Sequence, residues 1–352
     1  MKTFRELLGI GQPIIQAPMA GVQGSALAIA VCNAGGLGSL PCAMLSVEQI
    51  RSELSTIRSN TDRPYNVNFF CHSQPESDPQ REVAWRSTLA RYYDEYEIPA
   101  DEVSSGASRA PFSEQALELL EEFKPAVVSF HFGLPAEGLM ARVKAVDATV
   151  LSSATTVEEA CWLEKRGVDI VIAQGLEAGG HRGMFLSDDL TTQMGTFALL
   201  PQIVKAVKVP VIAAGGIADA AGVAAAMELG AVAVQIGTAY LLCQEATISP
   251  LHRAALKSDA ARHTAVTNLF TGRPARGIVN RIMRELGPIH NEAPRFPLAA
   301  SAITPLRAKA ESCGDNGFSP LWCGQNASGC AELPAAEITR MLAVGAARRN
   351  LL

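Results

Sequence analysis

The sequence predicts an α/β protein whose core is a closed (β/α)₈ (TIM) barrel, with a smaller and mainly helical subdomain added to it. Three observations support this prediction. Short apolar runs alternate with segments of helical periodicity along most of the chain. The apolar runs are nearly continuous, which is typical of parallel strands buried on both faces. There are eight such runs, the number of strands that closes a (β/α)₈ barrel.

The predicted strands are separated by predicted helices, so they should be parallel and joined by right-handed crossovers. The strands are expected over residues 14–20, 37–40, 65–70, 126–132, 149–153, 169–174, 210–214 and 231–236. The helices are expected over residues 26–33, 47–58, 138–145, 157–166, 197–207 and 220–229. The last helix should have Asp219 as its N-cap and Gly230 directly after its C-terminus.

Two stretches interrupt this alternation. We predict a barrel over 1–241 that contains a polar insertion at 73–124, a substrate-side subdomain over 242–330, and a closing C-terminal segment at 331–352. Helices inside these stretches are expected near 79–96, 113–122 and 334–348.

Composition excludes several classes of protein. Hydrophobic residues make up 48% of the 352 residues and charged residues 18%, so disorder is excluded as the main state. The net charge of −5, without a long basic run, argues against a nucleic-acid partner. No apolar run is long enough for a membrane span, and the N-terminus lacks the apolar core of a signal peptide. We therefore expect a cytoplasmic protein that binds neither nucleic acid nor membrane.

The eight cysteines are scattered and form no CxxC pair, so we interpret them as reduced thiols and predict no metal site.

Charge is distributed unevenly along the sequence. Residues 242–330 hold ten Lys or Arg and six Asp or Glu, a local net charge of +4 within an acidic chain. Two interpretations remain open: this region attracts a small anion, or it is a solvated basic surface.

Glycines follow the last two predicted strands. Gly215 and Gly216 end the seventh, and Gln235, Ile236, Gly237 and Thr238 end the eighth. The loops after strands seven and eight are the usual phosphate site of this fold. Glycine lets backbone N–H groups approach phosphate oxygens, and the Thr238 hydroxyl can add a donor. The alternative is that these are tight turns needed only for packing.

A histidine lies in the glycine-rich loop after the sixth predicted strand. His181 stands in QGLEAGGHRG, at the end of the barrel where active sites occur. Imidazole can act there as acid, base or hydrogen-bond donor. A histidine in such a loop can also be structural. His131, near the end of the fourth strand, is interpreted first as a core or supporting residue.

The familiar nucleotide and hydrolase motifs are absent. The sequence contains no GxSxG, HExxH, GxxxxGK[ST] or GxGxxG. A cofactor held by a single phosphate therefore fits better than a dinucleotide, and FMN is the predicted cofactor. Asn68 and Gln174, at strand ends, could hydrogen-bond its ring or ribityl chain.

At this point the chain resembles the nitronate monooxygenases, formerly called 2-nitropropane dioxygenases, and in particular class I. The resemblance spans nearly the whole sequence. The matching motifs are QAPMAG, NAGGLGSL, NVNFF, SFHFGLP, AQGLEAGGHRG, IAAGGIAD, VQIGTAYL, TGRPARG and LWCGQ. The strand-one, EAGGH and AAGGI motifs are shared with FMN-dependent enoyl-acyl-carrier-protein and quinone reductases.

The resemblance implies an FMN-dependent enzyme that uses O₂ to convert alkyl nitronates into a carbonyl compound and nitrite. It implies propionate 3-nitronate as substrate and detoxification as the role. His181 takes the catalytic position in this family. Residues 17–19 should lie under the flavin ring. The flavin-contact positions are Asn68, Gln174, Gly179, Gly216, Gln235, Ile236, Gly237 and Thr238.

Several alternatives stay open at this stage. Protonated His181 could bind the anionic nitronate, whereas neutral His181 could remove the α-proton of a nitroalkane. Arg273 and Arg276 could clamp a substrate carboxylate or simply pack the subdomain onto the barrel. The chain could instead be an FMN-dependent NAD(P)H reductase, or a binding barrel without turnover. A homodimer is an option that the sequence does not decide.

Overall fold

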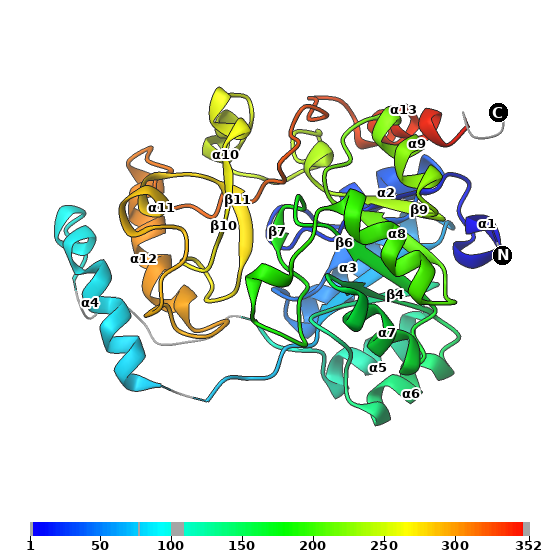
Figure 1. Cartoon of the computed structure of the whole chain (residues 1–352), viewed down its shortest axis with the longest axis horizontal. Helices are drawn as coiled ribbons and strands as arrows, with labels where there is room; N and C mark the ends of the chain where they lie inside the picture. Colours follow the sequence, from blue (N-terminus) through cyan, green and yellow to red (C-terminus); the bar gives the residue numbers. More distant parts are fainter. Residues whose placement is uncertain (1–2, 77, 100–108, 348–352) are drawn as a thin grey trace.

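The computed structural model describes residues 3–76, 78–99 and 109–347. They form a closed barrel of parallel strands ringed by helices, with a smaller body over one end (Figure 1). This confirms the predicted fold class. The barrel strands are β1 (Ile14–Gln16), β2 (Gly38–Pro41), β3 (Tyr65–Phe70), β4 (Val127–His131), β5 (Thr149–Ala154), β6 (Ile170–Gln174), β8 (Val211–Ala214) and β9 (Ala233–Ile236).

Hydrogen bonding closes the barrel all the way around. The strands lie in the order β1-β9-β8-β6-β5-β4-β3-β2, and each neighbouring pair is parallel. The two ends of this order meet where Ile15 pairs with Leu37, and the Gln16 N–H donates to the Leu37 carbonyl at 2.9 Å. The barrel therefore leaves no free sheet edge.

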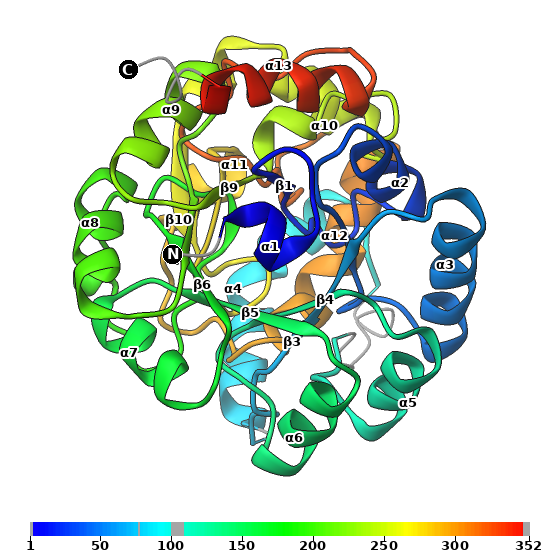
Figure 2. The ribbon, with the colours of Figure 1, turned by 90° about the vertical axis from the view of Figure 1, so that its right-hand side faces the viewer.

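A ring of helices surrounds the barrel (Figure 2). These helices are α2 (Ser25–Asn33), α3 (Val47–Asn60), α5 (Glu114–Phe123), α6 (Glu137–Ala145), α7 (Val157–Lys165), α8 (Thr196–Ala206), α9 (Ala220–Glu228) and α13 (Ala335–Ala347). The C-terminal α13 packs against both α9 and α2, so it completes the ring. Short α1 (Phe4–Leu8) lies across the amino-terminal end of the strands.

Local sequence signals explain where these helices start and stop. The Asp219 carboxylate accepts the Gly222 N–H at 2.8 Å, and Gly230 follows α9 with φ of +103°, both as predicted. Ser46 and Gln49 form a reciprocal capping box at the start of α3. The barrel strands are buried almost throughout, which agrees with their continuous apolar sequences.

The insertion contributes to two parts of the molecule. Its helix α5 belongs to the barrel ring, whereas α4 (Pro79–Glu95) packs on α12 (Ala299–Ser312). Trp85 and Tyr92 of α4 are buried in one hydrophobic cluster with residues of α12 and with Phe318. We call α4 together with residues 242–330 the cap. The domain boundaries at 241/242 and 330/331 stay a prediction.

The cap contains a small sheet that the sequence analysis did not predict, and the positions of the helices within 242–330 were not predicted either. Its remaining elements are α10 (Pro250–Leu256), α11 (Arg281–Leu286), β10 (Thr264–Thr267), β11 (Ala275–Ile278) and the 3₁₀ turn η4 (Asp259–Arg262). Two further 3₁₀ turns, η2 (Leu190–Thr192) and η3 (Thr238–Tyr240), follow barrel strands. Strand β11 pairs antiparallel with β10 and with the two-residue β7 (Gly180–His181), which links the cap to the barrel.

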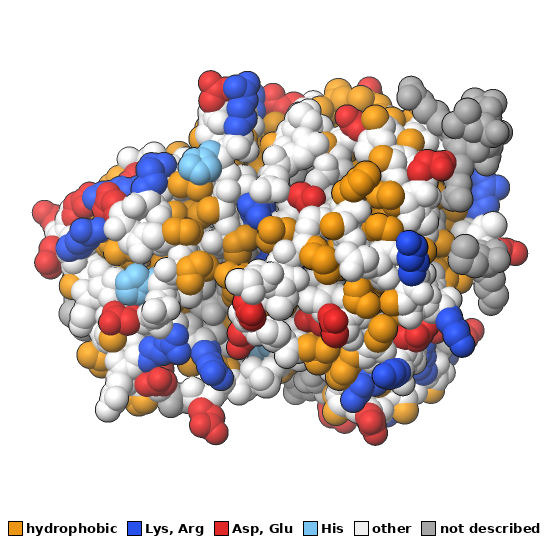
Figure 3. Space-filling model, in the orientation of Figure 1, with side chains coloured by type: hydrophobic (Ala, Val, Ile, Leu, Met, Phe, Trp, Pro, Cys, Tyr) orange, Lys and Arg blue, Asp and Glu red, His pale blue; other side chains and the backbone are white. Residues whose placement is uncertain are grey.

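Surface charges on the cap are largely mixed. On the face shown in Figure 3, Lys and Arg side chains of the cap lie among Asp and Glu. Arg281 pairs with Glu95 at 2.5 Å and with Glu285 at 2.8 Å. This mixing favours a solvated surface on that face over a broad anion-attracting one. None of the helices in the described residues has the length and apolarity required to cross a membrane.

Candidate active site

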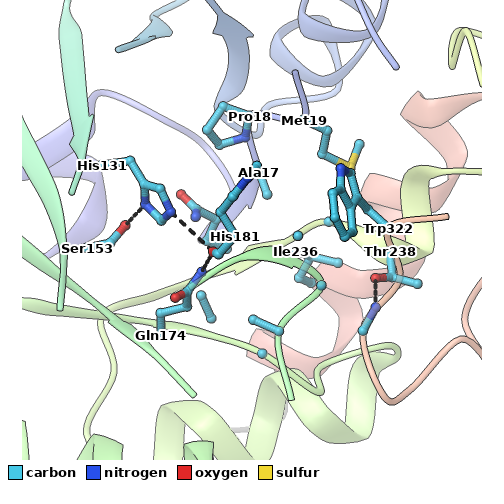
Figure 4. Close-up of a pocket in the computed structure, with 18 of the residues that line it drawn as sticks. Ala17, Pro18, Met19, His131, Ser153, Gln174, His181, Ile236, Thr238 and Trp322 are labelled. Carbon is cyan, nitrogen blue, oxygen red and sulfur yellow. Dashed lines mark hydrogen bonds between the residues drawn. The ribbon is translucent and has the colours of Figure 1, made fainter. Parts of the chain in front are cut away.

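A pocket lies at the carboxyl ends of the barrel strands, where the cap covers them (Figure 4). This end of a (β/α)₈ barrel is the usual place of the active site. The structure brings all ten residues selected from the sequence into the lining of this one pocket. They are Asn68, Gln174, Gly179, His181, Gly215, Gly216, Gln235, Ile236, Gly237 and Thr238.

Two glycine turns form one wall of the pocket. Gly215 has φ of +118° and Gly216 has φ of +74°, a region that side chains disfavour. A Cβ on Gly215 would also lie 2.9 Å from Thr196 Oγ1. The backbone N–H groups of Gly216 and Thr238 donate to no other described residue. These free donors on adjacent strands make the wall suitable for a phosphate.

Two polar groups at this wall have defined roles within the protein. Thr238 Oγ1 accepts the Gly324 N–H at 2.9 Å, so its own proton remains free to be donated. The Glu177 carboxylate accepts the Thr196 N–H at 2.8 Å and the Thr196 hydroxyl at 2.9 Å, at the start of α8. The positive end of that helix offsets the negative charge of Glu177.

The rest of the pocket fits a flat heterocycle with polar edges. Ala17, Pro18 and Met19 line the pocket, and so does Trp322 of the cap (Figure 4). Gln235 Oε1 is buried and has no hydrogen-bond partner among the described residues. A ligand that donates a hydrogen bond could pair with this buried oxygen. The donor set and the glycine wall therefore fit FMN.

Backbone and side-chain bonds together position His181. Strand β7 pairs His181 with Ala275 of β11. The His181 carbonyl accepts Gln174 Nε2 at 3.0 Å and lies 3.2 Å from His131 Nε2. Gln174 Oε1 also accepts the Gly183 N–H at 2.7 Å. Gln174 thus fixes the loop that carries His181.

The His181 ring lies in a largely aromatic environment. Its centroid is 5.4 Å from the Phe296 ring and 5.6 Å from the Trp322 ring. Burial lowers the pKa of His181 well below its usual value, and the nearby Arg109 cation lowers it further. Its Nε2 lies 2.9 Å from Thr271 Oγ1. Nδ1 has no hydrogen-bond partner in the described part of the chain and is the nitrogen available to a substrate.

His131 supports this arrangement, as the sequence analysis suggested. Its Nδ1 lies 3.0 Å from Ser153 Oγ and its Nε2 faces the His181 carbonyl, so both ring nitrogens are used. Because a carbonyl accepts only, Nε2 must carry the proton. Burial lowers the pKa of His131 to about 3, so the ring is neutral.

Arg273 and Arg276 pack the cap onto the barrel. Arg273 donates to the Met184 carbonyl, and its guanidinium lies 4.0 Å from the centre of the Phe132 ring. Arg276 donates through Nε to the Leu176 carbonyl at 2.9 Å. Neither side chain lines the pocket. The structure therefore supports the packing interpretation for both.

Sequence reasoning missed several residues that line the pocket, and three of them carry a cationic, titratable or large aromatic side chain from outside the barrel. Arg109 comes from the insertion, and His252 and Trp322 come from the cap. None of them follows a barrel strand, so the strand-end rule could not find them. The LWCGQ motif was the one signal that pointed near the pocket, since it contains Trp322. The described residues contain no cluster of His, Cys, Asp or Glu that could hold a metal ion.

Fold and pocket together define a (β/α)₈-barrel enzyme with its site at the strand ends. The family model for nitronate monooxygenase matches residues 2–344. A nitronate monooxygenase from Paraburkholderia phytofirmans is 44% identical over 339 residues, covering 96% of this chain and 92% of the relative. The chain therefore belongs to the nitronate monooxygenase family, a family of flavoenzymes, and is an oxidoreductase.

Two solved structures are also similar. A nitroalkane oxidase from Streptomyces ansochromogenes matches with a TM-score of 0.90 at 38% identity, covering 100% of both chains. FabK from Thermotoga maritima matches with a TM-score of 0.75 at 28% identity, covering 100% of this chain and 98% of that one. Family membership excludes the earlier alternative of a binding barrel without turnover.

Proposed function

We propose that this protein is an FMN-dependent nitronate monooxygenase. The FMN phosphate would lie between the loops after β8 and β9, at the N–H groups of Gly216 and Thr238. Asn68 and Gln235 would hydrogen-bond the ring or ribityl chain. Bound FMN would take electrons from the nitronate and pass them to O₂. The observation that carries the proposal is that one pocket brings together three features. These are the glycine turns with free backbone N–H groups, the Gln235 side-chain oxygen that has no partner among the described residues, and His181.

His181 would bind and orient the substrate in its neutral form. Its lowered pKa supports neutral imidazole at pH 7 in the protein without ligand. If Thr271 donates its hydroxyl proton to the Arg273 carbonyl, 3.4 Å away, Nε2 carries the ring proton and Nδ1 is a free base. Nδ1 could then take the α-proton of a neutral nitroalkane. This favours the neutral alternative over the protonated one.

The proposed substrate is an alkyl nitronate, and specifically propionate 3-nitronate. The products would be a carbonyl compound and nitrite, and the role would be detoxification. Arg109 gives the pocket a cation, and Glu177, the one carboxylate among the described lining residues, is bound to the start of α8. An anionic substrate is therefore favoured. We also propose a cytoplasmic location, which the eight unpaired cysteines support.

A visible spectrum followed by anaerobic titration tests this function. The purified protein should be yellow and release FMN on heating. Propionate 3-nitronate added without O₂ should bleach the flavin absorbance, and O₂ should restore it with formation of nitrite. A flavin that stays oxidised with every nitronate would contradict the proposal.

The second candidate is an FMN-dependent NAD(P)H reductase of the enoyl-thioester or quinone type. The similarity to FabK keeps this candidate in consideration. The same anaerobic mixing separates the two. Rapid bleaching by NADH or NADPH, with no response to nitronate, would favour the reductase.

A homodimer remains a proposal that sedimentation analysis can test.

A further inference from the structure

One cation in the pocket wall has neither an ion pair nor an oxygen acceptor among the described residues. Arg109, from the insertion, lines the same pocket as His181. Its Nη1 is buried without a hydrogen-bond partner, and Nη2 contacts only Met44 Sδ, at 3.9 Å. Neither an ion pair nor a carbonyl contact satisfies this guanidinium within the described residues. A partly buried charge without hydrogen-bond partners is costly, and a ligand that supplies acceptors would lower this cost.

Two buried arginines near the site, Arg182 and Arg276, are satisfied by the protein itself. Arg182 donates to the carbonyls of Gln174 and Gly175 at 2.8 and 2.7 Å. Arg276 donates to the carbonyl of Leu176. These two cations stabilise loops, whereas the donors of Arg109 remain available. The difference indicates a ligand-binding role for Arg109.

Arg109 lies close enough to His181 for both to contact one small substrate. Both lie near Phe296, whose ring centre is 5.9 Å from the Arg109 guanidinium carbon and 5.4 Å from the His181 ring centre. In the described part of the chain, the other charged or titratable groups near Arg109 include His72, Arg273 and Arg307. No carboxylate competes for the guanidinium among them. A planar guanidinium binds a carboxylate through two parallel hydrogen bonds.

We propose that Arg109 binds a second anionic group, a carboxylate, at the end of the substrate away from the reacting carbon. Arg109 would then be the residue that makes the enzyme prefer nitronates bearing a carboxylate over simple alkyl nitronates. This inference rests on the proposed function, since it assigns a specificity residue to the same pocket. It assigns no role to Arg273 or Arg276, the two arginines that the sequence analysis considered as possible clamps for a substrate carboxylate.

The test compares two substrates of equal chain length in wild-type protein and in Arg109→Gln. Propionate 3-nitronate carries the carboxylate, and propyl 1-nitronate has a methyl group in its place. Loss of a charge-assisted bidentate contact should raise KM for propionate 3-nitronate roughly 10- to 100-fold, with kcat little changed. The KM for propyl 1-nitronate should change less than about threefold. Arg109→Lys keeps the positive charge but cannot form two parallel hydrogen bonds. Its KM for propionate 3-nitronate should lie between those of the wild type and Arg109→Gln.

A binding measurement without turnover provides a second readout. Succinate has the shape of propionate 3-nitronate with a carboxylate in place of the nitronate, and butyrate lacks the second charge. Calorimetry on the FMN-loaded wild-type protein should show succinate binding at least tenfold more tightly than butyrate. Arg109→Gln should remove this preference. Arg91→Gln, an exposed arginine of α4 paired with Glu285, is the matched control and should retain it.

The outcomes separate the two levels of the proposal. If wild-type protein oxidises neither nitronate, the proposed function fails. If it oxidises both and Arg109→Gln weakens both equally, or neither, the assignment of Arg109 is wrong. If Arg109→Gln does not fold, equal binding of succinate and butyrate to wild-type protein still overturns the assignment.

Discussion

Thr271 Oγ1 lies 2.9 Å from Nε2 of His181, and this contact joins the cap to the ring that we propose as catalytic. Thr271 is itself buried. Because the hydroxyl fixes which ring nitrogen faces the pocket, Thr271→Val should lower kcat roughly tenfold, about 1.4 kcal/mol, with FMN retained. Steady-state kinetics with a pH profile would measure this.

Thr271→Ser is the matched control because it keeps the hydroxyl. It should retain kcat within about threefold of wild type. A Thr271→Val enzyme with unchanged kcat and pH profile would show that the contact does not position His181.

His181→Ala should retain FMN and lose most nitronate turnover, by about 100-fold or more. The loss has two sources: the substrate loses a hydrogen-bonding partner, and neutral nitroalkanes lose a base. If Nδ1 acts as that base, the loss should be greater for a neutral nitroalkane than for its preformed nitronate. Comparing kcat/KM for the two forms measures the difference, and wild-type activity in the variant would remove His181 from the mechanism.

The barrel could be predicted from the sequence because its signals are local. Each strand is a continuous apolar run, and Asp219 and Gly230 mark the ends of α9. The candidate site residues could be selected because they follow strands, and parallel strands end at one face. The predicted ten residues therefore meet in one pocket.

The cap contacts could not be predicted in the same way. Strand β7 is only two residues long, and its partner Ala275 lies far along the chain from His181. A short strand held by a distant partner has no periodicity of its own. Nothing in the sequence around Arg109 distinguishes it from the other arginines of the polar insertion. Its importance follows from a buried Nη1 that has no hydrogen-bond partner among the described residues, which only the structure shows.

Gly216→Asp should weaken FMN binding at least tenfold, about 1.4 kcal/mol. The residue has φ of +74°, and its Cβ would point toward Glu177, with the carbons 3.4 Å apart. An aspartate there would bring a second carboxylate to the predicted phosphate site. Gly216→Asn is the control, since asparagine tolerates this backbone region and is neutral. The ratio of flavin to protein after gel filtration measures the effect, and full FMN content in Gly216→Asp would mean that the phosphate lies elsewhere.

Stability should fall as the pH decreases from about 6.5 toward 4, because several histidines are buried in their neutral form. Burial lowers the pKa of His131 to about 3 and that of His72 and His252 to about 4. Below pH 6.5 the unfolded chain binds protons that the folded chain does not, so each histidine can remove at most about 1.4 kcal/mol per pH unit. Thermal unfolding followed between pH 8 and 4.5 measures this slope.

In the His131→Gln variant, stability should depend less steeply on pH, because one fewer histidine takes up a proton on unfolding. This should hold even if the stability of the variant at pH 8 is lower. The exposed His263 provides the control, and His263→Gln should follow the wild-type curve. The window from pH 6.5 to 4.5 is informative because the carboxylates with lowered pKa values, such as Glu95 and Glu285, lose their contribution only at lower pH. A wild-type unfolding temperature that stays constant across this window would contradict neutral burial of these histidines.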